Sequence, residues 1–178
     1  MNSSMSKKFI QRTLICLAVL YGFLVVIGSE LVPPVYTATA EVNISATPTK
    51  IWRVLTEFTL YKNWNPYLIA TEGELKSGQE ITITLRNKNF DKPFTTTPVI
   101  ASVNKNKSFH WVNGFPVPGI YDSKHYFILK PTGNGQTILL QYEEFRGVLV
   151  WLLPGKDKRK AATEEGFNLM HNAMKTML

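Results

Sequence analysis

Seventeen consecutive residues without a charge, residues 13–29, divide this chain into a membrane-type segment and a remainder typical of a water-soluble domain. A helix that crosses the hydrocarbon core of a bilayer needs ~20 predominantly apolar residues, and apolar residues on both sides of the run bring it near that length. No polar face interrupts the run, which argues against the core helix of a soluble protein. The run therefore predicts one N-terminal transmembrane helix.

The charges in front of this run predict its orientation. Lys7, Lys8 and Arg12 precede it, and basic residues favour the cytoplasmic side of a spanning helix. We therefore expect a single-pass membrane protein with a cytoplasmic N-terminus and an extracytoplasmic domain. The alternative is a signal peptide cleaved near residues 26–28 and a secreted protein, although the run exceeds the ~7–15 residues of a usual signal core.

The rest of the chain is expected to form one domain. Pro33 and Pro34 end any preceding helix, so we place the anchor (or signal segment) and linker at residues 1–35 and the domain at 36–178. The only cysteine is Cys16, which leaves the domain without a disulfide framework, zinc site or cysteine nucleophile. From residue 36 onward, 17 Lys and Arg against 12 Asp and Glu leave a charge of +5. No dense basic stripe with interleaved aromatics appears, so no nucleic-acid partner is expected.

Within residues 36–178 the apolar residues alternate first and later recur at helical spacing. Thr47 followed by Pro48 is a typical helix start, and Ile51, Trp52 and Leu55 continue at helical spacing. Strands are expected at residues 39–46, 80–85, 94–103, 108–113, 123–130 and 137–146, separated by turn residues. A final helix is indicated by an apolar stripe of Phe167, Met170, His171, Met174 and Leu178. The order predicts an α+β fold with an antiparallel meander.

Several stretches, in this order, resemble one family. They are residues 46–58 (ATPTKIWRVLTEF), 61–66 (YKNWNP), 109–111 (FHW), 125–129 (HYFIL) and 141–147 (QYEEFRG). Together they resemble the polyketide cyclase/dehydrase-like members of the START-like, or SRPBCC, superfamily. The resemblance implies a helix-grip fold, in which a curved antiparallel β-sheet wraps around a long C-terminal α-helix with an apolar cavity between them. It also implies a bound sterol, lipid, hormone or polyketide, and in some members cyclisation or dehydration.

Two side chains are candidates for chemistry in such a cavity. Because side chains alternate along a strand, His125 shares a face with Phe127 and Leu129, and Glu143 shares one with Phe145. A hairpin can bring His125 and Glu143 together, and a histidine beside a carboxylate is suited to general acid/base catalysis. The alternatives are a hydrogen-bonded pair that stabilises the sheet, or two residues that do not touch.

The remaining predicted site residues are mostly large apolar or aromatic side chains. With His125 and Glu143, the predicted ligand-binding set is Trp64, Trp111, Tyr121, Phe145, Phe167, Met170, His171 and Met174. For each of them the alternative is ordinary core packing, and for His171 the edge of the packed helix face. Three scattered histidines give no metal-site spacing, so neither a metal nor another cofactor is expected.

Two apolar stretches outside the helices remain. Residues 114–119 (GFPVPG) are expected to form a rigid turn with a partly buried Phe115, or alternatively a lid or a loop that dips into lipid. Residues 148–153 (VLVWLL) are too short to span a bilayer and are expected to finish the last strand, or alternatively to touch lipid if they are exposed. The following basic cluster, residues 156–160, is expected to be solvated, with contact to an anionic membrane surface as the alternative.

These observations lead to one expected function and two alternatives. We expect a membrane-anchored START-like domain that binds a hydrophobic or amphipathic small molecule, lipid-like or polyketide-like. The first alternative is a cyclase or dehydratase that uses His125 and Glu143 in the same cavity. The second is a protein-binding module with a filled core. No nucleophile motif or phosphate loop appears in the sequence.

Overall fold

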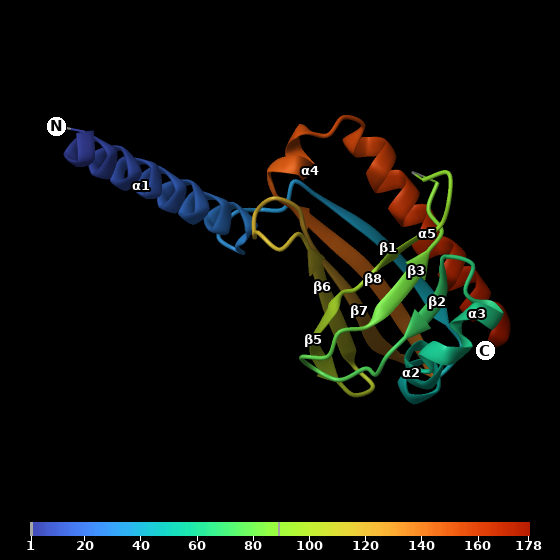
Figure 1. Ribbon diagram of the computed structural model, residues 1–178. Coiled ribbons are helices and arrows are strands. Elements are labelled where there is room, and N and C mark those ends of the chain that lie inside the picture. The colour runs from blue at the N-terminus through green and yellow to red at the C-terminus, as the bar shows by residue number, and fades with distance from the viewer. Residues whose placement is uncertain (1, 89) are drawn as a thin grey trace.

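The structure, a computed structural model, describes residues 2–88 and 90–178 and has the expected α+β architecture (Figure 1). Its elements are α1 (Asn2–Gly28), β1 (Tyr36–Ile44), α2 (Pro48–Thr56), the 3₁₀ turn η1 (Phe58–Leu60), α3 (Tyr61–Trp64), β2 (Leu68–Glu72), β3 (Thr82–Leu85), β4 (Phe94–Thr96), β5 (Val99–Asn104), β6 (Ser108–Gly114), β7 (Asp122–Gly133), β8 (Gln136–Arg146), α4 (Val148–Leu152) and α5 (Lys156–Met177). The predicted start of α2 is confirmed, because Pro48 is its first residue and the Thr47 side chain accepts from the backbone N–H of Lys50.

The strands form two antiparallel sheets. The larger has the order β1-β8-β7-β6-β5 and the smaller the order β2-β3-β4. The stretch 94–103, expected to be one strand, is divided between them as β4 and β5. Pro98 lies at the break and has no N–H for a ladder, whereas its carbonyl accepts from Ile81 at 3.0 Å. A single predicted strand therefore becomes the point where the chain passes from one sheet to the other.

The hairpin of β7 and β8 fixes the register of the central strands. Asn134 and Gly135 both have positive φ, 52° and 73°, which suits a tight two-residue turn between twisted strands. From this turn the pairing continues to Asp122 opposite Arg146, and it places His125 directly opposite Glu143. The predicted proximity of these two side chains is confirmed at the level of the backbone.

Helix α5 packs across the sheets with its predicted apolar stripe inward. Phe167, Met170 and Met174 are fully buried. His171, which belongs to the predicted stripe, is buried with them at 1% exposure, so the alternative position at the edge of the face is wrong. The helix approaches Tyr67, the residue before β2, closely, because a Cβ on Gly166 would overlap the Tyr67 ring.

Helix α1 projects from one end of the domain, opposite α2 and α3 (Figure 1). Residues Lys7–Gly28 are long and apolar enough to cross a membrane, with a mean hydropathy of 2.1 and none of the helix buried. The last turn of α1 rests on the loop between β6 and β7. A Cβ on Gly119 would overlap the carbonyl oxygen of Leu24, so this contact requires glycine.

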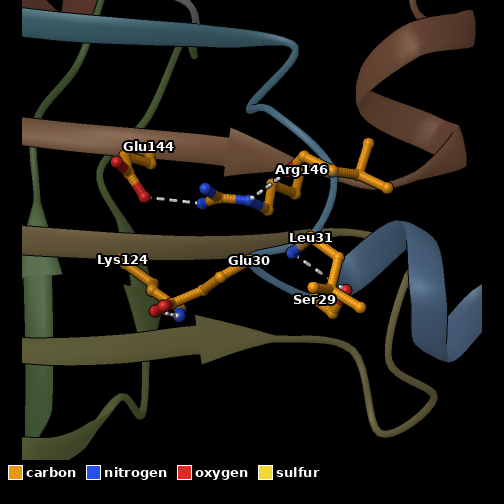
Figure 2. A network of polar contacts seen from close by, with 7 residues as sticks. Ser29, Glu30, Leu31, Lys124, Glu144 and Arg146 are labelled. Atoms are coloured by element: carbon orange, nitrogen blue, oxygen red, sulfur yellow. Dashed lines mark hydrogen bonds and ion pairs between the residues drawn. The ribbon is translucent and has the colours of Figure 1, made fainter.

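Polar contacts fasten the segment after α1 to the sheet (Figure 2). Glu30 pairs with Lys124 of β7 at 2.6 Å. Arg146, at the end of β8, donates to the Val32 carbonyl at 3.2 Å and pairs with Glu144 at 2.6 Å. The linker is thus held along its length, and α1 has a defined position on the domain.

Two apolar stretches differ from expectation. Residues 148–152 form the short helix α4 instead of finishing β8, because the strand ends at Arg146 and Gly147 has a φ of 110° that redirects the chain. Phe115, expected to be partly buried, is 55% exposed. Both α4 and Phe115 therefore expose apolar side chains on the surface near α1.

Candidate ligand-binding site

A cavity of ≈460 Å³ lies between the two sheets and α5. The smaller sheet contributes apolar side chains from β2, β3 and β4, and the larger sheet contributes residues of β6, β7 and β8. Helix α5 contributes Arg159 and Thr163, and the loop before β7 and the region of α4 complete the wall. The lining is Tyr36, Tyr67, Leu68, Ile83, Leu85, Asn87, Phe90, Phe94, Thr96, Trp111, Asn113, Phe115, Tyr121, Ser123, His125, Glu143, Phe145, Leu149, Leu153, Arg159 and Thr163.

His125 and Glu143 give this mostly apolar cavity a polar region. His125 Nδ1 lies 3.9 Å from a carboxylate oxygen of Glu143, and the Ser123 hydroxyl donates a hydrogen bond to the same carboxylate. Only 4% of the His125 side chain and 14% of the Glu143 side chain are exposed. Both groups are therefore held where water has little access.

Burial favours the uncharged form of both residues. It raises the pKa of Glu143 to about 7, with the Ser123 hydrogen bond acting in the opposite direction. Burial, with a smaller contribution from the charge of His171, lowers the pKa of His125 to about 3. Near neutral pH His125 is thus neutral and Glu143 is poised between its two forms. The 3.9 Å contact between His125 and Glu143 is therefore a polar contact rather than a fixed ion pair.

The second ring nitrogen of His125 contacts Gln141. Gln141 Nε2 lies 3.4 Å from His125 Nε2, so both ring nitrogens have a polar neighbour. The ring itself is fixed by stacking on Phe127 at 4.4 Å and packing on Phe167 at 4.7 Å.

The structure places five of the ten predicted ligand-binding residues on the cavity wall. These are Trp111, Tyr121, His125, Glu143 and Phe145. The other five lie elsewhere: Phe167 behind the His125 ring, Met170 against Gln141, His171 and Met174 in the core of the α5 face, and Trp64 on α3 against Tyr61. Whether any of the ten contacts a ligand stays a prediction.

Sequence reasoning missed the contribution of the smaller sheet. Ile83 and Leu85 belong to a strand that was expected, and their alternation with Thr82 and Thr84 could have marked them as one face. The register between the two sheets could not be read in the same way. Ser123 and Gln141 were also missed, although both share strand faces with the residues that were singled out.

Comparisons with known proteins agree with this architecture. The family described as polyketide cyclase / dehydrase and lipid transport matches residues 36–171. No curated protein matches the chain. Among solved structures, the Zhui aromatase/cyclase from Streptomyces sp. R1128 has a TM-score of 0.63 at 15% identity, covering 80% of this chain and 92% of that one.

Two further structures have the same fold. A START superfamily protein from Mycobacterium smegmatis has a TM-score of 0.62 at 13% identity, covering 79% of this chain and 95% of that one. Protein MLL2253 from Mesorhizobium loti has a TM-score of 0.60 at 20% identity, covering 80% and 96%. At these identities the likeness establishes the fold alone. With the family match over residues 36–171 and a cavity gripped between sheet and helix, the chain belongs to the polyketide cyclase/dehydrase and lipid transport family of START-like proteins.

Proposed function

We propose that this protein binds a hydrophobic or amphipathic small molecule, lipid-like or polyketide-like, while α1 anchors it in a membrane with the domain on the extracytoplasmic side. The observation that carries the proposal is the ≈460 Å³ cavity with a mainly apolar lining and one polar region. A pocket of this kind suits a ligand of a few hundred daltons, because apolar walls supply affinity and few polar groups supply orientation. The filled-core alternative expects packed side chains where this cavity lies.

The polar region favours a ligand with a hydroxyl or carbonyl group near one end. Neutral His125 can donate from one ring nitrogen and accept at the other, and Glu143 in its protonated form can donate as well. An anionic group placed here would meet the Glu143 charge as soon as that residue ionises. The expected ligand is therefore neutral at the end that reaches His125.

Mass spectrometry of an organic extract tests the binding function. The full chain, purified from its native host in mild detergent, is expected to yield one apolar compound at about one molecule per chain. Thr163→Phe is the blocking variant for comparison. Thr163 of α5 lines the cavity, and a phenylalanine ring at this position reduces the volume of the cavity. The folded variant is expected to retain little of the compound. Recovery of nothing from the native chain, together with no binding of apolar dyes, would contradict the proposal and favour a partner-binding module.

The second candidate function is a cyclisation or dehydration in the same cavity, and the His125–Glu143 contact favours it. A carboxyl with a pKa of about 7 can both give and take a proton near neutral pH. His125→Ala is expected to abolish turnover of the extracted compound or its precursor while binding survives, measured as product by mass spectrometry and as ligand retained. Unchanged turnover in His125→Ala would end this candidate and leave the binding function intact.

A further inference from the structure

Apolar side chains gather on the surface at the end of the domain that carries α1. We call these residues the apolar rim: Phe115 and Val117 on the β6–β7 loop, and Trp151, Leu152 and Leu153 at α4. Trp151 is 73% exposed and Leu152 is 60% exposed. Large apolar side chains clustered in this way on a surface mark a site of contact with a protein or a membrane.

The rim is built against the end of α1. The backbone N–H groups of Val148 and Leu149, at the start of α4, donate to the carbonyls of Gly119 and Ile120 at 2.8 and 2.9 Å. Gly119 is also the residue on which the last turn of α1 rests. The loop, α4 and the end of α1 therefore form one packed unit, and Figure 1 shows them together at one end of the molecule.

The length of the helix brings this unit to the bilayer. Residues 9–28 are predominantly apolar and extend about 30 Å at 1.5 Å per residue. The hydrocarbon core is ~30 Å thick, so a spanning α1 ends close to Gly28 at the surface of that core. Gly28 packs against the loop of the rim, because a Cβ on Gly28 would overlap the backbone of Gly119. The end of the span therefore holds the rim at the surface of the bilayer.

The rim also contributes to the wall of the cavity. Phe115 and Leu153 belong both to the rim and to the cavity wall, and Leu149 of α4 lines the cavity beside them. Beyond α4, Lys156 and Lys158 are exposed at the start of α5, with Asp157 between them. Their excess of positive charge suits the negative surface of a bilayer that contains anionic lipid.

We propose that the apolar rim lies in the interface of the bilayer that holds α1, so that the cavity opens toward lipid and its ligand passes between bilayer and cavity without crossing water. The inference rests on the proposed anchoring by α1. It names a lipid bilayer rather than a second copy of the chain, because the rim is continuous with the only helix of the described residues, 2–88 and 90–178, that is apolar enough to span one.

Tryptophan fluorescence of the full chain in nanodiscs tests the proposal. Trp151 is the exposed one of the four tryptophans, since Trp52 and Trp111 are buried and Trp64 is partly buried. Nanodiscs are prepared with phospholipids brominated near the headgroup end of the acyl chains, because bromine quenches indole on contact. Subtracting the fluorescence of Trp151→Phe from that of the native chain gives the emission of Trp151. We expect the brominated lipids to reduce this emission by at least half and to quench the variant little.

Two substitutions make the test sharper. Phe115→Asp places a charge in the rim and is expected to reduce the quenching of Trp151 at least twofold. Lys105→Asp, on the exposed turn at the other end of β6, is the matched control and is expected to leave the quenching of Trp151 unchanged.

A Trp151 signal that no bromolipid quenches would overturn the proposal, and nanodiscs that hold paired chains would then assign the rim to a second copy. A chain that does not enter nanodiscs at all contradicts the anchoring instead, and an unquenched but anchored chain leaves the ligand-binding function intact.

Discussion

Replacing Phe167 with alanine is expected to lower the free energy of unfolding by about 3–5 kcal/mol, the usual cost of deleting a buried aromatic side chain. Phe167 is fully buried on α5, packs on the Tyr67 ring at 5.9 Å and supports the His125 ring at 4.7 Å. Its loss leaves a void next to the ligand cavity and removes one face of the contact that fixes His125. Denaturant unfolding of the full chain in detergent micelles, followed by tryptophan fluorescence, measures the change.

Leu169→Ala is the matched control for Phe167→Ala. Leu169 lies on the same helix but is 45% exposed, so truncating it removes little buried area. We expect this variant to lose less than about 1 kcal/mol. If the two variants proved equally stable, α5 would not be packed on the sheets as described.

Replacing Glu143 with glutamine is expected to stabilise the protein at pH 8 and to change it little at pH 4.5. The folded-state pKa of about 7 lies above the ordinary value of 4.5, so the folded protein holds this proton more tightly than the unfolded chain. The stabilisation from the proton is fully present below about pH 4.5 and is lost as the pH rises through 7. Glutamine stays neutral and escapes this loss. The gain at pH 8 corresponds to about 3 kcal/mol at about 1.4 kcal/mol per pKa unit.

The two buried histidines have the opposite pH dependence. Burial lowers the pKa of His125 to about 3 and that of His171 to about 4, so their stabilisation is present above pH 6.5 and is lost as the pH falls. Both histidines remain in Glu143→Gln, and comparing the variant with the native chain at each pH isolates Glu143. Denaturant midpoints at pH 4.5, 6 and 8 provide that comparison.

Glu144→Gln is the control, and it is expected to change the stability in the opposite direction. Glu144 lies one residue further along β8, faces the other side of the sheet and pairs with Arg146 at 2.6 Å. Weakening this partly exposed pair is expected to lower stability by less than about 1 kcal/mol at pH 8. A destabilised Glu143→Gln at pH 8 would mean that Glu143 works as a charged partner in the fold rather than as a buried, readily protonated acid.

Local patterns in the sequence predicted the parts of the fold that depend on local physics. Thr47-Pro48 set the start of α2, and the apolar stripe from Phe167 to Met174 set the buried face of α5. The alternation in β7 and β8, with a turn at Asn134-Gly135, brought His125 opposite Glu143. In each case the interacting residues are neighbours along one element or across one hairpin.

The features that the sequence did not reveal depend on contacts between distant segments. The break at Pro98 and the closure of the cavity by β2, β3 and β4 depend on how the two sheets meet. Residues 148–152 are apolar enough for a strand, and their helical form follows from the turn at Gly147 and the bonds to Gly119 and Ile120.

The glycine contact between α1 and the domain has a mechanical consequence. The backbone of Gly119 contacts the backbone of Leu24, and Glu30 of the next segment pairs with Lys124, so the structure holds α1 and the domain in one arrangement. A spanning helix changes its tilt with the thickness of its bilayer. In the proposed membrane-anchored state, a change in the tilt of α1 would therefore turn the whole domain relative to the lipid surface.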